Sequence, residues 1–195
     1  MEHRLHQVIG DIVQEAAKGL SGVRPLLDPA CGVPKAGHHN LPLFLSEEPS
    51  NATEICNVDA VILVGNRVED YRIKVVVEIE EADVGPTKIC GKFLTTTLAK
   101  YLIHEKLGDR PVPFDAAATF VQVLDTSGLK LGRSAKPRQW KNIEDAIKAA
   151  IRDTPLVKAT GVTGYMLVHG NKDDFGRNGA KRRELMEFLR QAVER

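Results

Sequence analysis

Two runs of apolar, β-branched residues lie close together in the chain, and they constrain the fold more than any other feature. The first run is Ala60–Val64, and the second, mostly apolar, is Ile73–Ile79. Apolar runs of this length are typical of strands that are buried on both faces, and β-branched residues favour strands. Gly65 and Asn66 begin a turn between the two runs. The sequence therefore predicts an antiparallel hairpin inside a covered sheet.

Helical and strand patterns follow one another around this hairpin. Apolar residues recur at steps of three and four in four segments: Leu5–Ala17, about Pro86–His104, a segment that opens with a capping box at Asn142 and Asp145, and Gly179–Arg195. Further strands are predicted at Ala117–Leu124 and Tyr165–His169, with a short one around Leu41–Leu45 inside a proline-rich irregular arm at residues 24–50. This order predicts a three-layer α/β fold with a central mixed sheet flanked by helices, because helical crossovers join the later strands.

Length and charge exclude several classes of protein. The 195 residues suit a single domain spanning 1–195, and the net charge of +1 is not that of a bulk polycation. We find no apolar run long enough to span a membrane and no signal-peptide layout after Met1. Cys31, Cys56 and Cys90 are odd in number and scattered, which indicates reduced thiols. The sequence therefore predicts a cytoplasmic protein.

Acidic residues mark the ends of the two hairpin strands. Asp59 directly precedes the first run, and Glu78 and Glu80 end the second. Residues i and i+2 of a strand share a face, with Cα atoms about 6.6 Å apart, and Asp59 joins them if its strand is the antiparallel neighbour. Carboxylates are the ligands that hard cations such as Mg²⁺ prefer. The pattern predicts a metal site formed by Asp59, Glu78 and Glu80; the alternative is a strand end with solvated acids.

This layout resembles the PD-(D/E)xK nuclease superfamily, which includes type II restriction endonucleases and Holliday-junction resolvases. In that superfamily an aspartate starts one central strand, an acid-x-lysine sequence ends the next, and a helix follows. The corresponding residues here are Asn57-Val58-Asp59 and Glu78-Ile79-Glu80. The resemblance is clearest over residues 59–124. It implies a restriction-endonuclease-like fold, bound Mg²⁺ or Mn²⁺, and hydrolysis of DNA phosphodiester bonds.

The motif departs from the superfamily pattern in two places. No proline precedes Asp59, and Glu80 stands where the superfamily has a lysine, although some restriction enzymes carry glutamate there and remain active. Lys88 and Lys92, on the first two turns of the following helix, are candidates to point back at the acids, and Lys88 is our candidate catalytic lysine. The alternative for each is an ordinary solvated lysine. The resemblance also suggests Glu15 as an additional ligand, and the alternative is a surface glutamate.

Two cation-rich segments are candidates for binding phosphate. Residues 130–141 contain five cations, no acid and the only tryptophan, and residues 177–183 lead into the last helix. Helix N-termini, loop amides and basic side chains all hold phosphate groups. The candidate nucleic-acid contacts are Lys92, Arg133, Lys136, Arg138, Lys181 and Arg182. The alternative for both segments is a solvated charged surface.

These features predict a Mg²⁺-dependent DNA endonuclease, with a homodimer expected because a duplex requires two cuts. Two alternatives remain open: a catalytically inactive nucleic-acid-binding module of the same fold, and an α/β interaction protein without metal. Glycoside hydrolysis is weakly supported, since aromatic residues make up only 5% of the chain. His38 and His39 in the arm are either metal ligands or exposed loop residues. Phosphate-binding P-loop, dinucleotide-binding and Gly-x-Ser-x-Gly motifs are absent from the sequence.

Overall fold

The two apolar runs form adjacent antiparallel strands in a computed structural model of the chain, as predicted. β4 (Ala60–Val64) pairs with β5 (Arg72–Glu80), with Ala60 opposite Val77. The structure describes residues 4–32, 40–81, 84–129, 134–154 and 160–195. Within these ranges the protein is α/β, and the hairpin lies in a mixed sheet with further strands on both sides.

The described part of the chain contributes eight strands to this sheet, in the order β1-β4-β5-β7-β6-β2-β3, with β8 paired to β7. The remaining strands are β1 (Val23–Leu27), β2 (Leu41–Phe44), β3 (Glu54–Val58), β6 (Tyr101–Ile103), β7 (Pro111–Asp125) and β8 (Val162–Gly170). β5 and β8 run parallel to β7, whereas the other neighbouring pairs are antiparallel. The carboxyl ends of β5, β7 and β8 therefore lie at one edge of the sheet.

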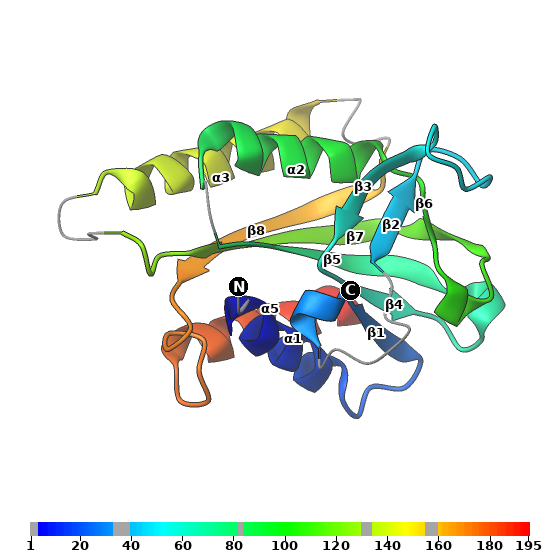
Figure 1. Cartoon of the computed structure of the whole chain (residues 1–195), viewed down its shortest axis with the longest axis horizontal. Coiled ribbons are helices and arrows are strands. Elements are labelled where there is room, and N and C mark those ends of the chain that lie inside the picture. The colour runs from blue at the N-terminus through cyan, green and yellow to red at the C-terminus, as the bar shows by residue number, and fades with distance from the viewer. Residues whose placement is uncertain (1–3, 33–39, 82–83, 130–133, 155–159) are drawn as a thin grey trace.

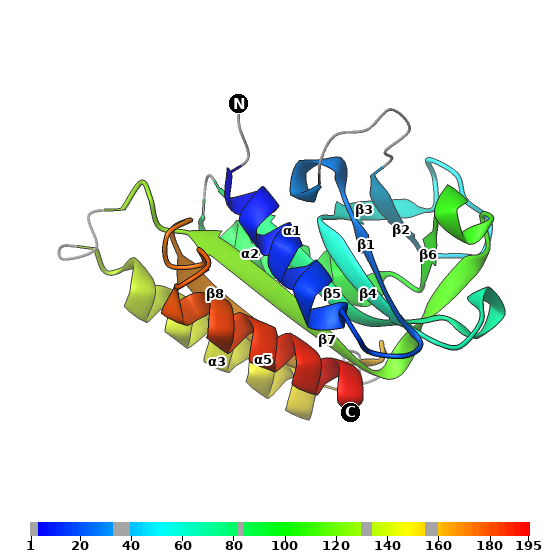
Figure 2. The same cartoon turned by 90° about the horizontal axis from the view of Figure 1, so that it is seen from below.

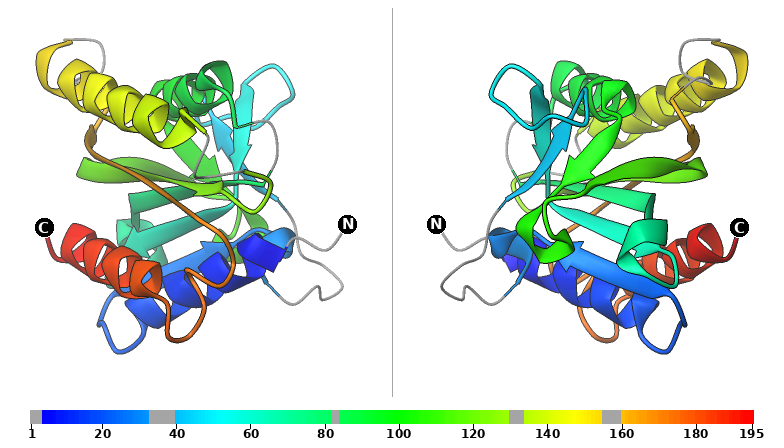
Figure 3. Two further views of the ribbon diagram at one scale, coloured as in Figure 1. Left: turned by 90° about the vertical axis from the view of Figure 1, so that its left-hand side faces the viewer. Right: turned by 90° about the vertical axis from the view of Figure 1, so that its right-hand side faces the viewer.

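Helices cover both faces of the sheet. They are α1 (Arg4–Ala17), α2 (Pro86–Leu98), α3 (Lys136–Asp153) and α5 (Ala180–Glu194). α2 and α3 lie over one face, while α1 and α5 lie over the other (Figures 1 and 3). Figure 2 shows α1 crossing below the strands with α5 beside it. α2 lies in the connection from β5 to β7, and α3 in the connection from β7 to β8. Parallel strands need such crossover connections, because a tight turn cannot return the chain to the same end of the sheet.

The core divides between these two faces because successive residues of a strand point to opposite sides. Val76 of β5 packs in the cluster under α2 and α3, which includes Phe93, Phe120 and Trp140. Val77, the next residue, packs in the cluster under α1 and α5. Burial on both faces explains why β4 and β5 show no alternation of apolar and polar residues.

The proline-rich arm is more regular than predicted. The predicted short strand is confirmed as β2, but Val23–Leu27 forms β1 and pairs with β4. β1 is an edge strand, where a proline such as Pro25 is tolerated because one side of the strand donates no ladder hydrogen bond. Glu54–Val58, not predicted as a strand, is β3 and pairs with β2. These short strands exist because of partners that are distant in sequence.

Two helix boundaries also differ from the prediction. α2 ends at Leu98 rather than near His104, and the following residues form β6, which pairs with β2 and β7. α3 begins at Lys136 rather than at Asn142, with a proline in its first turn, where a missing N–H costs nothing. The predicted capping box at Asn142 is therefore wrong, since that residue lies inside the helix.

Each α-helix in the described ranges carries charged residues. Within those ranges, no helix combines the length and apolar character that crossing a bilayer requires. The three cysteines are free thiols in the structure: Cys31 is buried, Cys56 is partly buried and Cys90 is exposed.

Candidate functional site

The strand pairing brings Asp59 to the end of β5. Asp59 lies between β3 and β4, one residue before Ala60, which is paired with Val77. The backbone N–H of Ile79 donates a hydrogen bond of 2.6 Å to Asp59 Oδ2. Asp59 is therefore next to the segment that carries the two glutamates, at the end of the hairpin where the sequence suggested a site.

Lys88 and Lys92 both extend from α2 toward the acids. Of the two alternatives for these lysines, the structure shows contact with the acids rather than ordinary solvated side chains. Lys92 Nζ lies 3.0 Å from Glu78 Oε2, and Lys88 Nζ lies 2.5 Å from Glu80 Oε2. Four residues of helix rise about 6 Å and two residues of strand about 6.6 Å, so the two spacings match. The matched spacing lets two consecutive ion pairs join α2 to β5.

Each glutamate keeps one oxygen outside its ion pair. The side chains of Glu78 and Glu80 are only 1% and 5% exposed. Among the described residues, Glu78 Oε1 and Glu80 Oε1 are buried without a hydrogen-bond partner. A buried carboxylate oxygen without a donor or a cation costs several kcal/mol, about 2–7 for a polar group. These two oxygens, two residues apart on one strand, are the unusual feature of the site.

Acids and cations are unequal in number here. Asp59, Glu78, Glu80 and Glu81 supply four carboxylates, against which stand Lys88, Lys92 and the imidazole of His6. Burial and the negative charge of Asp59 outweigh the effect of Lys92 and together raise the pKa of Glu78 to about 8. The carboxylates therefore outnumber the cations when Glu78 is ionised, and the raised pKa means that Glu78 holds a proton near neutral pH in the absence of a further cation.

His6 connects the acids to α1. Its Nε2 lies 3.5 Å from Asp59 Oδ1, and its Nδ1 lies 3.1 Å from Glu81 Oε1. Burial lowers the pKa of His6, but its bonds to Asp59 and Glu81 outweigh burial and raise the pKa to about 9. Glu81 also accepts the backbone N–H groups of Leu5 and His6 at the start of α1. His6 and Glu81 thus hold the N-terminus of α1 against the end of β5.

The predicted metal ligands Asp59, Glu78 and Glu80 are engaged in separate contacts in this arrangement. Within the ranges that the structure describes, no group of three or more histidine, cysteine, aspartate or glutamate side chains is placed to hold a metal ion. Asp59 is bound to Ile79 and His6, while the glutamates each face a lysine. The acids share one end of the hairpin, but each already has a separate partner.

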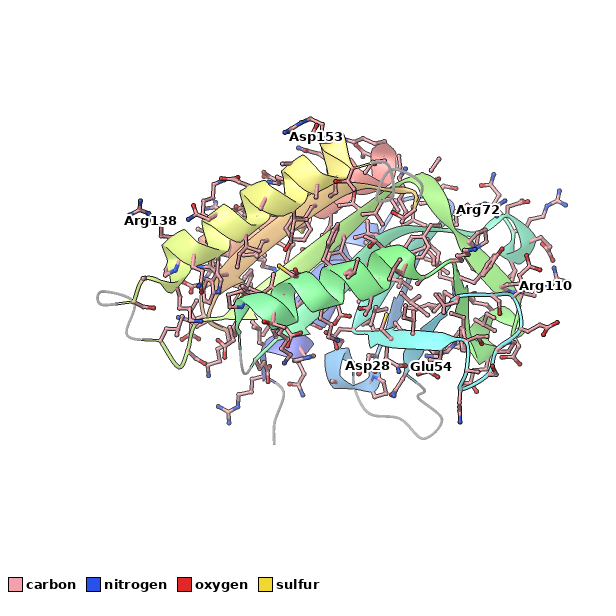
Figure 4. All side chains as sticks on the ribbon, turned by 90° about the horizontal axis from the view of Figure 1, so that it is seen from above. Asp28, Glu54, Arg72, Arg110, Arg138 and Asp153 are labelled. Carbon is pink, nitrogen blue, oxygen red and sulfur yellow. The ribbon has the colours of Figure 1, made fainter. Side chains whose placement is uncertain are left out.

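The predicted nucleic-acid contacts that the structure describes lie on α2, α3 and α5. Lys92 is committed to Glu78, and Lys181 forms an ion pair with Glu184. Arg138 extends into solvent from the start of α3 (Figure 4), and Arg133 lies outside the described residues. Lys136 lies beside the start of α2, since its Nζ is 3.4 Å from the carbonyl oxygen of Val84.

Glu15 and Arg182 form an ion pair between α1 and α5. Neither residue is in contact with the acids at the end of β5 in this arrangement, so Glu15 reads as a surface glutamate. Arg182 also donates to the carbonyl oxygen of Phe175 at 3.5 Å. His38 and His39 lie outside the described residues.

Sequence reasoning missed a buried polar link between the sheet and α2. Gln122 of β7 is fully buried, and its amide donates to the carbonyl oxygen of Ile89 at 3.2 Å. The hydroxyl of Tyr165 in turn donates to Gln122 Oε1 at 2.6 Å. This link fixes the first turns of α2, which carry Lys88. Its only sequence signal is a glutamine inside the apolar strand Ala117–Leu124, and His6 gives a similar signal in the apolar stripe of α1.

Comparisons with protein-family models, with curated proteins and with solved structures found no match to this chain.

Proposed function

We propose that the protein is a metal-dependent phosphodiesterase that hydrolyses DNA, with Asp59, Glu78 and Glu80 as ligands of Mg²⁺ or Mn²⁺. One observation carries the proposal: two buried glutamates on one strand each leave an oxygen without a partner. A bound divalent cation would offset the cost of burying these oxygens. An ion pair with a structural role requires only the oxygen that contacts the lysine.

The residues present fit a hard cation. Oxygen ligands from one to three carboxylates, completed by water, are what Mg²⁺ accepts. The surplus of carboxylates over cations and the raised pKa of Glu78 both favour adding positive charge at this point. When bound, such a cation supplies Lewis-acid chemistry at a phosphoryl oxygen and a nucleophilic water at neutral pH.

The lysines have different parts in this proposal. Lys92 holds Glu78 in the interior, because its ammonium is bound to the more deeply buried carboxylate. Lys88 is 41% exposed while bound to Glu80, so its ammonium can neutralise a phosphate that approaches the edge of the sheet. Lys88 thus takes the catalytic role that the motif lysine has in the PD-(D/E)xK superfamily.

The fold is compatible with a restriction-endonuclease-like arrangement. Asp59 directly precedes β4, and Glu78 and Glu80 lie at the end of the antiparallel strand β5. α2 is the next element after β5, and helices cover both faces of the sheet. Under this proposal the substrate is DNA and two copies of the chain act on the two strands of a duplex. Sedimentation in the presence and absence of duplex DNA measures the expected homodimer.

The test uses the full chain with Glu78→Gln and, as a matched control, Glu187→Gln on the exposed surface of α5. We expect calorimetry to detect Mn²⁺ binding to wild type and to Glu187→Gln but not to Glu78→Gln. Cleavage of plasmid DNA should follow the same pattern. Equal cleavage by Glu78→Gln and wild type overturns the proposal.

A second candidate is the inactive nucleic-acid-binding module. It is favoured by the fact that Glu78 and Glu80 already contact lysines, so the site is partly neutralised without metal. This candidate predicts salt-dependent retention of DNA with no turnover under Mg²⁺ or Mn²⁺. Calorimetry separates the two, since only the first predicts cation binding that depends on Glu78.

A further inference from the structure

A pocket of about 440 Å³ opens at the end of the sheet where α2 and α3 begin. Its lining includes Gly85, Asp125, Gly128, Lys136 and Trp140. Figures 1 and 4 show that both helices start at this end of the molecule. Gly85 precedes Lys88 by three residues, which is about 4.5 Å of helical rise. Gly85 in the pocket lining is therefore within one helical turn of the residue that pairs with Glu80.

Two helix N-termini meet at this pocket, and neither N-cap residue caps its helix through its side chain, although the Ser134 hydroxyl accepts the N–H of Lys136 in α3 at 3.2 Å. Gly85 is the N-cap of α2, and Ala135, next to Lys136, is the N-cap of α3; neither side chain caps its helix. An uncapped N-terminus exposes backbone N–H groups and the positive end of the helix dipole. Both termini favour a negatively charged ligand, but a helix terminus alone does not define a site.

Lys136 is the second observation. It is partly buried, and among the described residues its ammonium contacts the carbonyl oxygen of Val84, at the long distance of 3.4 Å, and no carboxylate. The other buried or partly buried lysines in the described ranges each have a carboxylate partner: Lys74 with Asp115, Lys92 with Glu78, and Lys181 with Glu184. A half-buried ammonium without a carboxylate is costly unless an anion from outside approaches it.

Trp140 is the third observation. Its ring is fully buried, lines the pocket and packs 5.2 Å from the ring of His169. Its indole Nε1 has no hydrogen-bond partner among the described residues. An indole N–H can only donate, so an acceptor is what this group lacks. Both side-chain donors and both helix termini thus call for the same kind of ligand.

Asp125 is the one acid among the described residues that line the pocket, and its carboxylate already accepts hydrogen bonds. The backbone N–H and the hydroxyl of Ser127 both donate to it. Its charge still opposes an anion, which gives the pocket a residue whose removal should strengthen binding.

We propose that this pocket binds a phosphate group, namely a backbone phosphate of the nucleic-acid strand that lies across the acids. The role in the strand rests on the proposed function, whereas affinity for phosphate does not require metal. Lys136, the two helix N-termini and the indole N–H of Trp140 supply the donors. The site positions the strand, and the reacting atoms remain at Glu78, Glu80 and Lys88.

Trp140 is the only tryptophan in the chain, so its fluorescence reports on the pocket directly. The experiment titrates the full chain, in buffer with a chelator, with inorganic phosphate and in a second arm with a single-stranded oligonucleotide. Chloride at equal ionic strength is the control. We expect a saturable change in emission with both phosphate ligands and none with chloride.

Variants assign the change to the pocket. Lys136→Gln should weaken phosphate binding about tenfold or more, the loss expected for a charge-assisted hydrogen bond. Lys148→Gln, an exposed lysine of the same helix, should leave it unchanged, and Asp125→Asn should strengthen it.

The inference is overturned if emission does not respond to phosphate, if chloride reproduces the response, or if Lys136→Gln binds phosphate as tightly as wild type. Tighter binding of the oligonucleotide than of inorganic phosphate assigns the site to an extended strand, whereas equal affinity for the two assigns it to a single phosphate group; both outcomes support the pocket. Glu78→Gln should bind phosphate normally. If the protein binds phosphate in the pocket but does not cleave DNA, only the proposed function is rejected. If it cleaves DNA but does not bind phosphate in the pocket, only the pocket is rejected.

Discussion

Replacing Glu78 by glutamine should change how the stability of the metal-free protein depends on pH. Burial and the nearby charge of Asp59 raise the pKa of Glu78 to about 8, against an ordinary value of 4.5. Between these two pH values the unfolded chain releases its proton while the folded protein keeps it. The stability that Glu78 contributes is therefore complete below pH 4.5 and is lost as the pH rises to about 8.

The magnitude follows from the width of this interval. Each pH unit corresponds to about 1.4 kcal/mol, so the titration of Glu78 lowers the free energy of unfolding by about 3 to 5 kcal/mol across it. Glutamine has nearly the same shape, can still accept from Lys92 and does not ionise. The free energy of unfolding of Glu78→Gln should therefore fall by that much less over the same range.

The measurement is the slope of the free energy of unfolding against pH, for wild type and for Glu78→Gln. Urea unfolding followed by far-ultraviolet circular dichroism gives it at several pH values between about 4.5 and 8.5, with a chelator present. Glu187→Gln is the control and should keep the wild-type slope. The slopes are compared rather than the absolute stabilities, because the glutamine amide places a new polar group in the interior at every pH. Parallel profiles for wild type and Glu78→Gln refute the reasoning, since the buried carboxyl then does not titrate in this window.

Three further predictions concern contacts around the site. His6→Gln should lower the free energy of unfolding by up to about 3 kcal/mol at pH 6, because the ion pairs of His6 stabilise the protein only while the imidazole is protonated. The difference from wild type should vanish as the pH rises above about 9. Urea unfolding at both pH values measures this difference. Tyr165→Phe should destabilise the protein by about 1–3 kcal/mol, since it leaves the buried Gln122 oxygen without its donor, and calorimetric melting checks this loss. Gly10→Ala should lower the melting temperature because its Cβ would overlap the carbonyl oxygen of Cys31; an unchanged melting temperature would show that α1 can shift away.

The position of the acids could be predicted from the sequence, whereas their contacts could not. The end of the hairpin that carries Asp59, Glu78 and Glu80 could be predicted, because strand alternation and antiparallel pairing follow from local patterns. The partner of each acid could not. Lys88 and Lys92 reach the glutamates only because α2 crosses β5 in one orientation.

The sequence by itself determined the strands β4 and β5, their antiparallel pairing and the alternation of helices and strands, since periodicity and β-branched content are local properties of the chain. Tertiary structure alone decided that β1 and β6 exist as strands, because their short segments gain order from ladder hydrogen bonds to β4 and β7. It also decided that Arg182 faces Glu15 while Lys136 lines the pocket beside α2. Charges have no preferred partner in a sequence, since their energy depends on distances that only the packed fold sets.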